Sequence, residues 1–197
     1  MRIIMSTSPL SVPFAASAQQ QAQTNAGILL VSGLVAQVAL LLKLYALENP
    51  LLLIALLACL SIAFVLAVFL MQLKVFQSKS RLSLVRHGFV ISAVGTLLLI
   101  LVLHGLPNDL QLFSAMAICG LGQGMVYSAA IRRGTHNDGH GLRRRALLIA
   151  GSIFAVAAVL LIQSSFSGIT GFPYAFAMLI DLSLLAALYV RVVELES

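Results

Sequence analysis

Residues 51–72 read LLLIALLACLSIAFVLAVFLMQ and contain no charged side chain. A helix of this length rises about 33 Å, at about 1.5 Å per residue, and the hydrocarbon core of a bilayer is about 30 Å thick. The stretch is rich in Leu and Ala and has no period-two alternation, so a strand of a membrane barrel does not fit. It therefore predicts a transmembrane helix.

Similar apolar stretches lie on both sides of it, separated by short charged or turn-forming clusters. The uncharged run 146–180 is too long for one span, and the Ser, Gly and Pro residues of 164–173 divide it. The six predicted helices cover about 27–47, 51–72, 87–104, 110–131, 146–163 and 172–190. Buried helices of a large soluble protein can also be apolar all round, but six in succession without an amphipathic partner argue against that alternative. The predicted fold class is an all-α membrane protein with six transmembrane helices.

The composition agrees with a membrane protein. The chain has 197 residues, of which 60% are hydrophobic and 9% are charged. Soluble domains carry about 25% charged residues, so this chain has too little polar material for a water-facing surface. This excludes soluble classes, including nucleic-acid binders, despite the net charge of +6.

The basic residues predict the orientation, because cytoplasmic loops accumulate Lys and Arg. Six spans place eleven basic residues on one side and only Lys43 on the other; the eleven are Arg2, Lys74, Lys79, Arg81, Arg86, Arg132, Arg133, Arg143, Arg144, Arg145 and Arg191. We therefore expect a multi-pass protein of the inner (plasma) membrane with both termini cytoplasmic. The basic loops are expected to contact anionic lipid headgroups.

Both chain ends are expected to lie outside the membrane domain 27–193. The Ser, Gln and Pro content of residues 6–25 predicts that residues 1–26 form a poorly ordered cytoplasmic segment, and residues 194–197 are expected to form a short cytoplasmic tail. Residues 16–18 (ASA) superficially suit a signal peptidase. Cleavage there would turn the basic loops outward, against the charge rule.

Two motifs carry a resemblance to a known family. One is LKLYALENPLL at 42–52, followed by a long Leu/Ala helix, a basic loop and Arg86-His87-Gly88; the other is GLGQGMVY at 120–127. In this order the chain resembles the C-terminal six-helix half of a major facilitator superfamily transporter, most similar to the drug:proton antiporter branch. Loop 73–81 (LKVFQSKSR) keeps the basic character of the family's loop but lacks its glycines and acid.

The resemblance implies a transporter that exports small hydrophobic or cationic compounds by alternating access, without a cofactor. One six-helix bundle forms only one wall of such a pathway, so it also implies a homodimer or a second six-helix half as partner. A truncated remnant of a transporter is a variant of this hypothesis. A non-transporting structural or accessory membrane protein is the alternative from a different class.

The glycine motif offers two kinds of candidate residue. Gly120, Gly122 and Gly124 are predicted to pack helices closely, because glycine lets another backbone approach. Gln123 and Tyr127 are four residues apart and thus share a helix face. That face either binds a substrate or hydrogen-bonds a neighbouring helix.

Asp181 is the single acid predicted near the bilayer midplane. An ionised carboxylate there costs about 2.5–3.5 kcal/mol on the mildest scale. A functional role in proton coupling or cation binding is one interpretation. The other is a protonated carboxyl that is hydrogen-bonded to Ser183 or another helix.

Other chemistry finds little support in the sequence. His136, Asp138 and His140 alternate on a Gly-rich loop, but the five flanking arginines repel cations, so no metal site is predicted. Cys59 and Cys119 lie inside predicted spans and are interpreted as buried free thiols. No nucleophile-and-base arrangement is found, and an intramembrane enzyme would need several polar groups at one depth, where the sequence offers only Asp181 with scattered Gln37, Gln123 and Gln163, so an enzyme is not expected. The sequence also has no phosphate-binding Gly-Lys loop, so ATP-driven transport by this chain is not expected.

Overall fold

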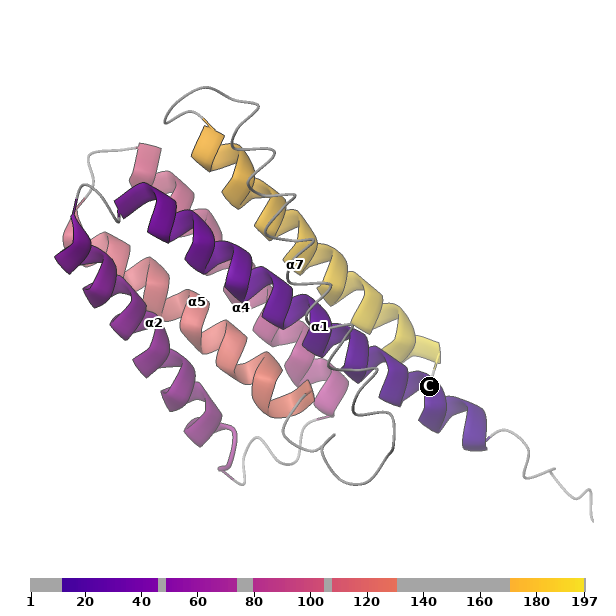
Figure 1. The fold of residues 1–197 in the computed structure, drawn as a ribbon. Helices are drawn as coiled ribbons and strands as arrows, with labels where there is room; N and C mark the ends of the chain where they lie inside the picture. Colours follow the sequence, from indigo (N-terminus) through magenta and orange to yellow (C-terminus); the bar gives the residue numbers. More distant parts are fainter. Residues whose placement is uncertain (1–11, 46–48, 74–79, 105–107, 131–170, 197) are drawn as a thin grey trace, which may run out of the picture.

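The computed structural model describes residues 12–45, 49–73, 80–104, 108–130 and 171–196, and these form five α-helices (Figure 1). They are α1 (Val12–Tyr45), α2 (Pro50–Leu70), α4 (Arg81–His104), α5 (Asp109–Ala130) and α7 (Gly171–Glu196). Each contains a segment long and apolar enough to cross a membrane. The predicted helix 146–163 lies outside the described residues.

Polar residues fix where three of the helices begin. The side chain of Asn49 accepts a hydrogen bond from the backbone N–H of Leu52 at 3.1 Å, and Pro50 occupies the first helical position of α2. Asn108 caps α5 in the same way, and the Ser80 hydroxyl accepts from the Ser83 N–H at the start of α4. These caps satisfy backbone donors that the helices themselves leave unpaired.

Helices α1 and α4 run in one direction along the bundle axis and α2, α5 and α7 run in the other, which gives the bundle two ends (Figure 1). We call the end with Arg81, Arg86 and Arg191 the arginine end. At the arginine end, the described parts of α1 and α4 begin and α2, α5 and α7 end. The opposite end, called the far end, holds the end of α1 and the starts of α2, α5 and α7. Both described termini are therefore on one side of the bundle.

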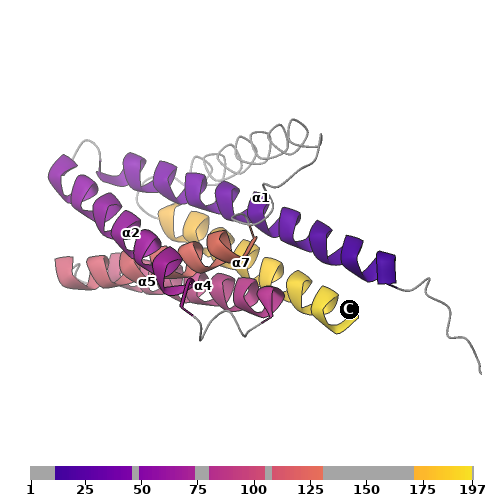
Figure 2. The same ribbon diagram turned by 90° about the horizontal axis from the view of Figure 1, so that it is seen from below.

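Helix α5 is the central element. It packs against α2 on one side and α4 on another, α7 lies against α4, and α1 crosses over α5 and α7 (Figure 2). Within its membrane-spanning window 56% of α5 is buried, against 28% of α2. Helix α2 is thus a peripheral helix, with α5 as its main support.

The distribution of polarity is that of a membrane protein. Large apolar side chains are exposed along the outer faces of α2, α4 and α7, among them Ile62, Phe69, Val94, Leu101, Leu185 and Leu188. By contrast, Gln37 and Gln123 are buried, with Ser32, Ser92 and Thr96. An apolar exterior around a polar interior suits a lipid environment, because exposing leucine to lipid tails costs no free energy. The chain is a multi-pass, all-α membrane protein.

Three predicted boundaries need correction. Helix α1 begins at Val12, so residues 12–26 are helical and not part of a poorly ordered lead. This stretch is rich in Ala and Gln, which are good helix formers, and Ala22 and Ala26 are buried in one cluster with Ala186 and Val190 of α7. Helix α7 likewise continues to Glu196, where a tail was expected from residue 194.

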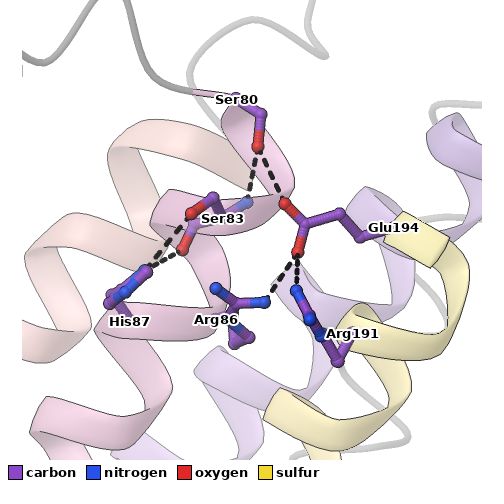
Figure 3. A network of polar contacts seen from close by, with 6 residues as sticks. All are labelled: Ser80, Ser83, Arg86, His87, Arg191 and Glu194. Atoms are coloured by element: carbon purple, nitrogen blue, oxygen red, sulfur yellow. Dashed lines mark hydrogen bonds and ion pairs between the residues drawn. The ribbon is translucent and has the colours of Figure 1, made fainter.

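The third correction concerns α4, which begins at Arg81 and not at His87. Its first turn is held to the last turn of α7 by a polar network (Figure 3). The Glu194 carboxylate accepts from Arg86 Nη1 at 2.8 Å and from the Ser80 hydroxyl at 3.1 Å, and Arg191 Nη1 lies 3.6 Å away. Arg86 and Glu194 lie outside the predicted spans, but in the structure both are helical and form an ion pair.

Arg86→Ala should lower the free energy of unfolding by about 0.5 to 1.5 kcal/mol, since it removes a charge-assisted hydrogen bond that is only partly exposed. Thermal unfolding in detergent, followed by circular dichroism, measures the change. Arg81→Ala is the matched control, because Arg81 is an exposed arginine at the start of the same helix. Equal melting temperatures for the two variants would contradict the prediction.

Candidate polar site in the bundle

A layer of polar side chains crosses the bundle at mid-depth. We call this the polar layer; it consists of Gln37 of α1, Ser92 and Thr96 of α4, Gln123 of α5 and Ser183 of α7. One apolar cluster, with Leu40, Leu99 and Cys119, lies towards the far end. A second, with Leu30, Phe89 and Val126, lies towards the arginine end. Four helices thus place their polar residues between two apolar clusters.

The two glutamines form the centre of the polar layer. Gln123 Nε2 donates a hydrogen bond to Gln37 Oε1 at 2.7 Å, and the residues are only 4% and 2% exposed. Gln37 Nε2 has the Met116 sulfur as a weak acceptor at 3.9 Å. Gln123 Oε1 is buried and accepts no hydrogen bond from any described residue. The pair therefore joins α1 to α5 and leaves one amide oxygen unused.

The hydroxyl groups of the layer are mostly bonded to their own helices. Thr96 Oγ1 donates to the Ser92 carbonyl oxygen at 2.9 Å, and Ser183 Oγ donates to the Leu179 carbonyl oxygen at 2.8 Å. Such bonds to the residue four positions earlier hold the hydrogen of the hydroxyl but leave lone pairs on its oxygen. These oxygens remain acceptors.

A small cavity lies against the polar layer, between α1, α4, α5 and α7. Its volume is about 20 Å³, and Leu29, Leu34, Phe89, Val126 and Leu182 are among its apolar lining residues. One water molecule needs about 10–15 Å³, whereas pockets for drug-sized ligands measure about 300–1,000 Å³. This cavity has room for a water molecule but not for a larger solute.

The three motif glycines lie at the two contacts of α5. Gly122 faces α4, where an added Cβ would be 2.6 Å from the Gly88 carbonyl oxygen. Gly120 and Gly124 face α2, where an added Cβ would meet the carbonyl oxygens of Leu60 and Phe64. All three positions bring helix backbones close together, as the packing interpretation expects.

Tyr127 and Gln123 do not meet at one site. The Tyr127 ring lies 5.3 Å from the ring of Phe64 on α2, at an interplanar angle of 55°, and Tyr127 is not among the cavity-lining residues. Gln123 points instead to Gln37 on α1. The spacing of four residues placed them on one face, but α5 has neighbours on several sides and the two side chains pack against different helices.

Asp181 lies at the depth of the polar layer but not in it. The cavity is lined by Leu179, Leu182 and Ser183, while Asp181 is exposed and forms no hydrogen bond or ion pair with another described residue. The hydrogen of the Ser183 hydroxyl is held by Leu179 and is not directed at the Asp181 carboxyl. The described structure therefore does not bring Asp181 together with Gln123.

The basic residues divide between described and undescribed parts of the chain. Arg81 and Arg86 lie at the arginine end. Lys74, Lys79, Arg132, Arg133, Arg143, Arg144 and Arg145 lie outside the described residues, as do His136, Asp138 and His140. Among the residues that are described, no group of three His, Cys, Asp or Glu is placed to hold a metal ion.

Sequence reasoning did not single out four members of the polar layer. Gln37 carried the same signal as Gln123, an amide inside an apolar span, and polar groups at that depth are usually partnered. Ser92, Thr96 and Ser183 carried no such signal, since hydroxyls in membrane helices commonly bond to their own backbone. Only the packing of four helices shows that they share a layer.

The chain matches no protein-family model, no curated protein and no solved structure.

Proposed function

We propose that this chain is a transporter unit of the major facilitator type, in which the bundle forms one wall of a pathway for small compounds. The observation that carries the proposal is the polar layer, with two buried glutamines at the middle of a membrane bundle. Polar groups at that depth are costly and often mark a substrate or ion pathway. The resemblance of 42–52 and 120–127 to that superfamily is a second, independent support.

The proposal includes six spans, with both termini cytoplasmic. Ala130 at the end of α5 belongs to the apolar cluster of the arginine end, whereas Ala175 near the start of α7 belongs to that of the far end. The chain between α5 and α7 thus joins opposite ends of the bundle. The uncharged stretch 146–163 is the segment of that connection with the length and composition of a span.

Reporter fusions are expected to locate the N-terminus, residue 140 and the C-terminus in the cytoplasm. The reason is the excess of Lys and Arg in and beside these segments. A fusion after residue 107 should be periplasmic, because it adjoins the far end. Paired alkaline phosphatase and green fluorescent protein fusions report the two sides, and a periplasmic C-terminus would refute the six-span arrangement.

Transport itself is tested by comparing export of fluorescent dyes from cells with and without the chain, alone and together with any membrane protein encoded beside it. Gln123→Leu should lower the export rate several-fold. Gln111→Leu should not, since Gln111 is an exposed glutamine of the same helix. Export equal to that of empty cells in every combination would refute transport.

A non-transporting structural or accessory protein is the second candidate, and the cavity volume of about 20 Å³ favours it. In that case the glutamine pair serves only to join α1 to α5. The two functions differ in the effect of Gln123→Leu. A purely structural role predicts loss of stability with no transport activity to lose.

Asp181→Asn tests whether Asp181 couples transport to protons. Because Asp181 is exposed and outside the cavity lining, we expect the variant to keep the export rate within about twofold of the parent chain. Export driven by an imposed pH gradient in membrane vesicles measures this, with Ser61→Ala on the exposed face of α2 as control. Complete loss of pH-driven export in Asp181→Asn alone would instead make it a coupling residue.

A further inference from the structure

The polar layer has no charged group. Every residue that lines the cavity is uncharged, and the polar ones offer two amides and three hydroxyls. Among the described lining residues, the buried polar atom that has no hydrogen-bond partner is an acceptor. Gln123 Oε1 is buried without a donor from the described residues, and the hydroxyl hydrogens of Thr96 and Ser183 are already used.

The acids that the structure describes are placed away from the cavity. Glu194 is at the arginine end, where it binds Arg86. Asp109 begins α5 at the far end, Glu196 ends α7, and Asp181 is exposed outside the cavity lining. The sequence has only two further acids, Glu48 and Asp138, and neither falls within a predicted span.

A cation that entered the polar layer would therefore find no carboxylate among the described residues as its partner. An unpaired charge in a low-dielectric interior is far more costly than an unpaired dipole. A neutral donor would instead satisfy the amide oxygen of Gln123, whose desolvation is otherwise uncompensated.

We infer that the polar layer selects uncharged solutes that carry a hydrogen-bond donor, and that it rejects cations. The inference rests on the proposed function and narrows its substrate class to the neutral compounds. It also implies that a solute enters only after the Gln37–Gln123 hydrogen bond opens, because the closed cavity is water-sized.

The test compares two fluorescent probes in cells that produce the full chain. N-phenyl-1-naphthylamine is neutral and has one N–H donor, whereas ethidium is a permanent cation. We expect export of the neutral probe at a rate above that of empty cells, at least a threefold loss in Gln123→Leu, and no loss in Gln111→Leu. Ethidium should not be exported.

Gln123→Glu supplies the missing carboxylate at the same position and is expected to gain export of ethidium. Its recovery from detergent as a single species, like that of Gln123→Leu, shows that the bundle is intact. Export of ethidium by the parent chain, or export of the neutral probe that is unaffected by Gln123→Leu, overturns the inference but leaves transport standing. Export of neither probe, by the chain alone or together with any membrane protein encoded beside it, overturns the proposed function and the inference with it.

Discussion

Gly122→Ala is expected to lower the free energy of unfolding by about 1 to 3 kcal/mol, although it adds only one methyl group. The new Cβ would lie 2.6 Å from the Gly88 carbonyl oxygen and 2.9 Å from the Ser92 Cα. Both atoms belong to the backbone of α4, so no side chain can rotate away and the two helices must separate. Helix association in a membrane depends on such close packing, because lipid provides no hydrophobic drive between helices.

Gly33→Ala is the matched control for this variant. Gly33 also lies in a membrane-spanning helix, but an added Cβ there would have no atom within 4 Å. Alanine is the better helix former by about 1 kcal/mol, so this variant should be as stable as the parent or slightly more stable. Unfolding of the purified proteins in mixed micelles by added dodecyl sulfate, followed by circular dichroism, measures both. Equal stability of the two variants would refute the packing role of Gly122.

Among the described helices, the sequence predicted both ends of α2 and α5 closely but missed the starts of α1 and α4 and the end of α7. An uncharged stretch such as 51–72 is favourable only in an apolar environment such as the bilayer, and the structure places α2 at Pro50–Leu70. The start of α4 and the end of α7 lie beyond the predicted ones, because the charged residues there belong to the helices. Arg86 and Glu194 are both helical and pair with each other across two helices. They are 108 positions apart in the sequence, so neither segment alone predicts their contact.

The sequence predicted how deep the candidate site residues lie in the membrane, but not which of them face the cavity. Gln123 stood out as an amide within an apolar span, and the structure places it in the polar layer. Asp181 has the depth that its sequence position indicates, but the rotation of α7 about its axis turns it away from the cavity. Periodicity gives the relative angle of residues on one helix, whereas the neighbour that each face meets depends on tertiary packing.

Gln37→Leu and Gln123→Leu are expected to lower the free energy of unfolding non-additively. This is the second prediction with a large effect. Each single substitution removes one partner of the 2.7 Å hydrogen bond and leaves a buried amide behind. We expect each to lower the free energy of unfolding by about 1 to 3 kcal/mol, the cost of an unsatisfied buried polar group. The double variant replaces both amides with apolar groups of similar size, so its loss should be smaller than the sum.

The coupling energy between the two residues should be about 0.6 kcal/mol and at most about 1.7 kcal/mol, the average and the maximum for hydrogen bonds between membrane helices. The same dodecyl sulfate unfolding measures all four proteins of the cycle. Gln37→Leu combined with Gln111→Leu is the control cycle, and it should be additive because Gln111 is exposed near the start of α5. Additive losses for Gln37 and Gln123 would mean that the hydrogen bond does not join α1 to α5. In that case α1 would be held by its apolar contacts alone, and opening the polar layer to a solute would not require the glutamines to separate.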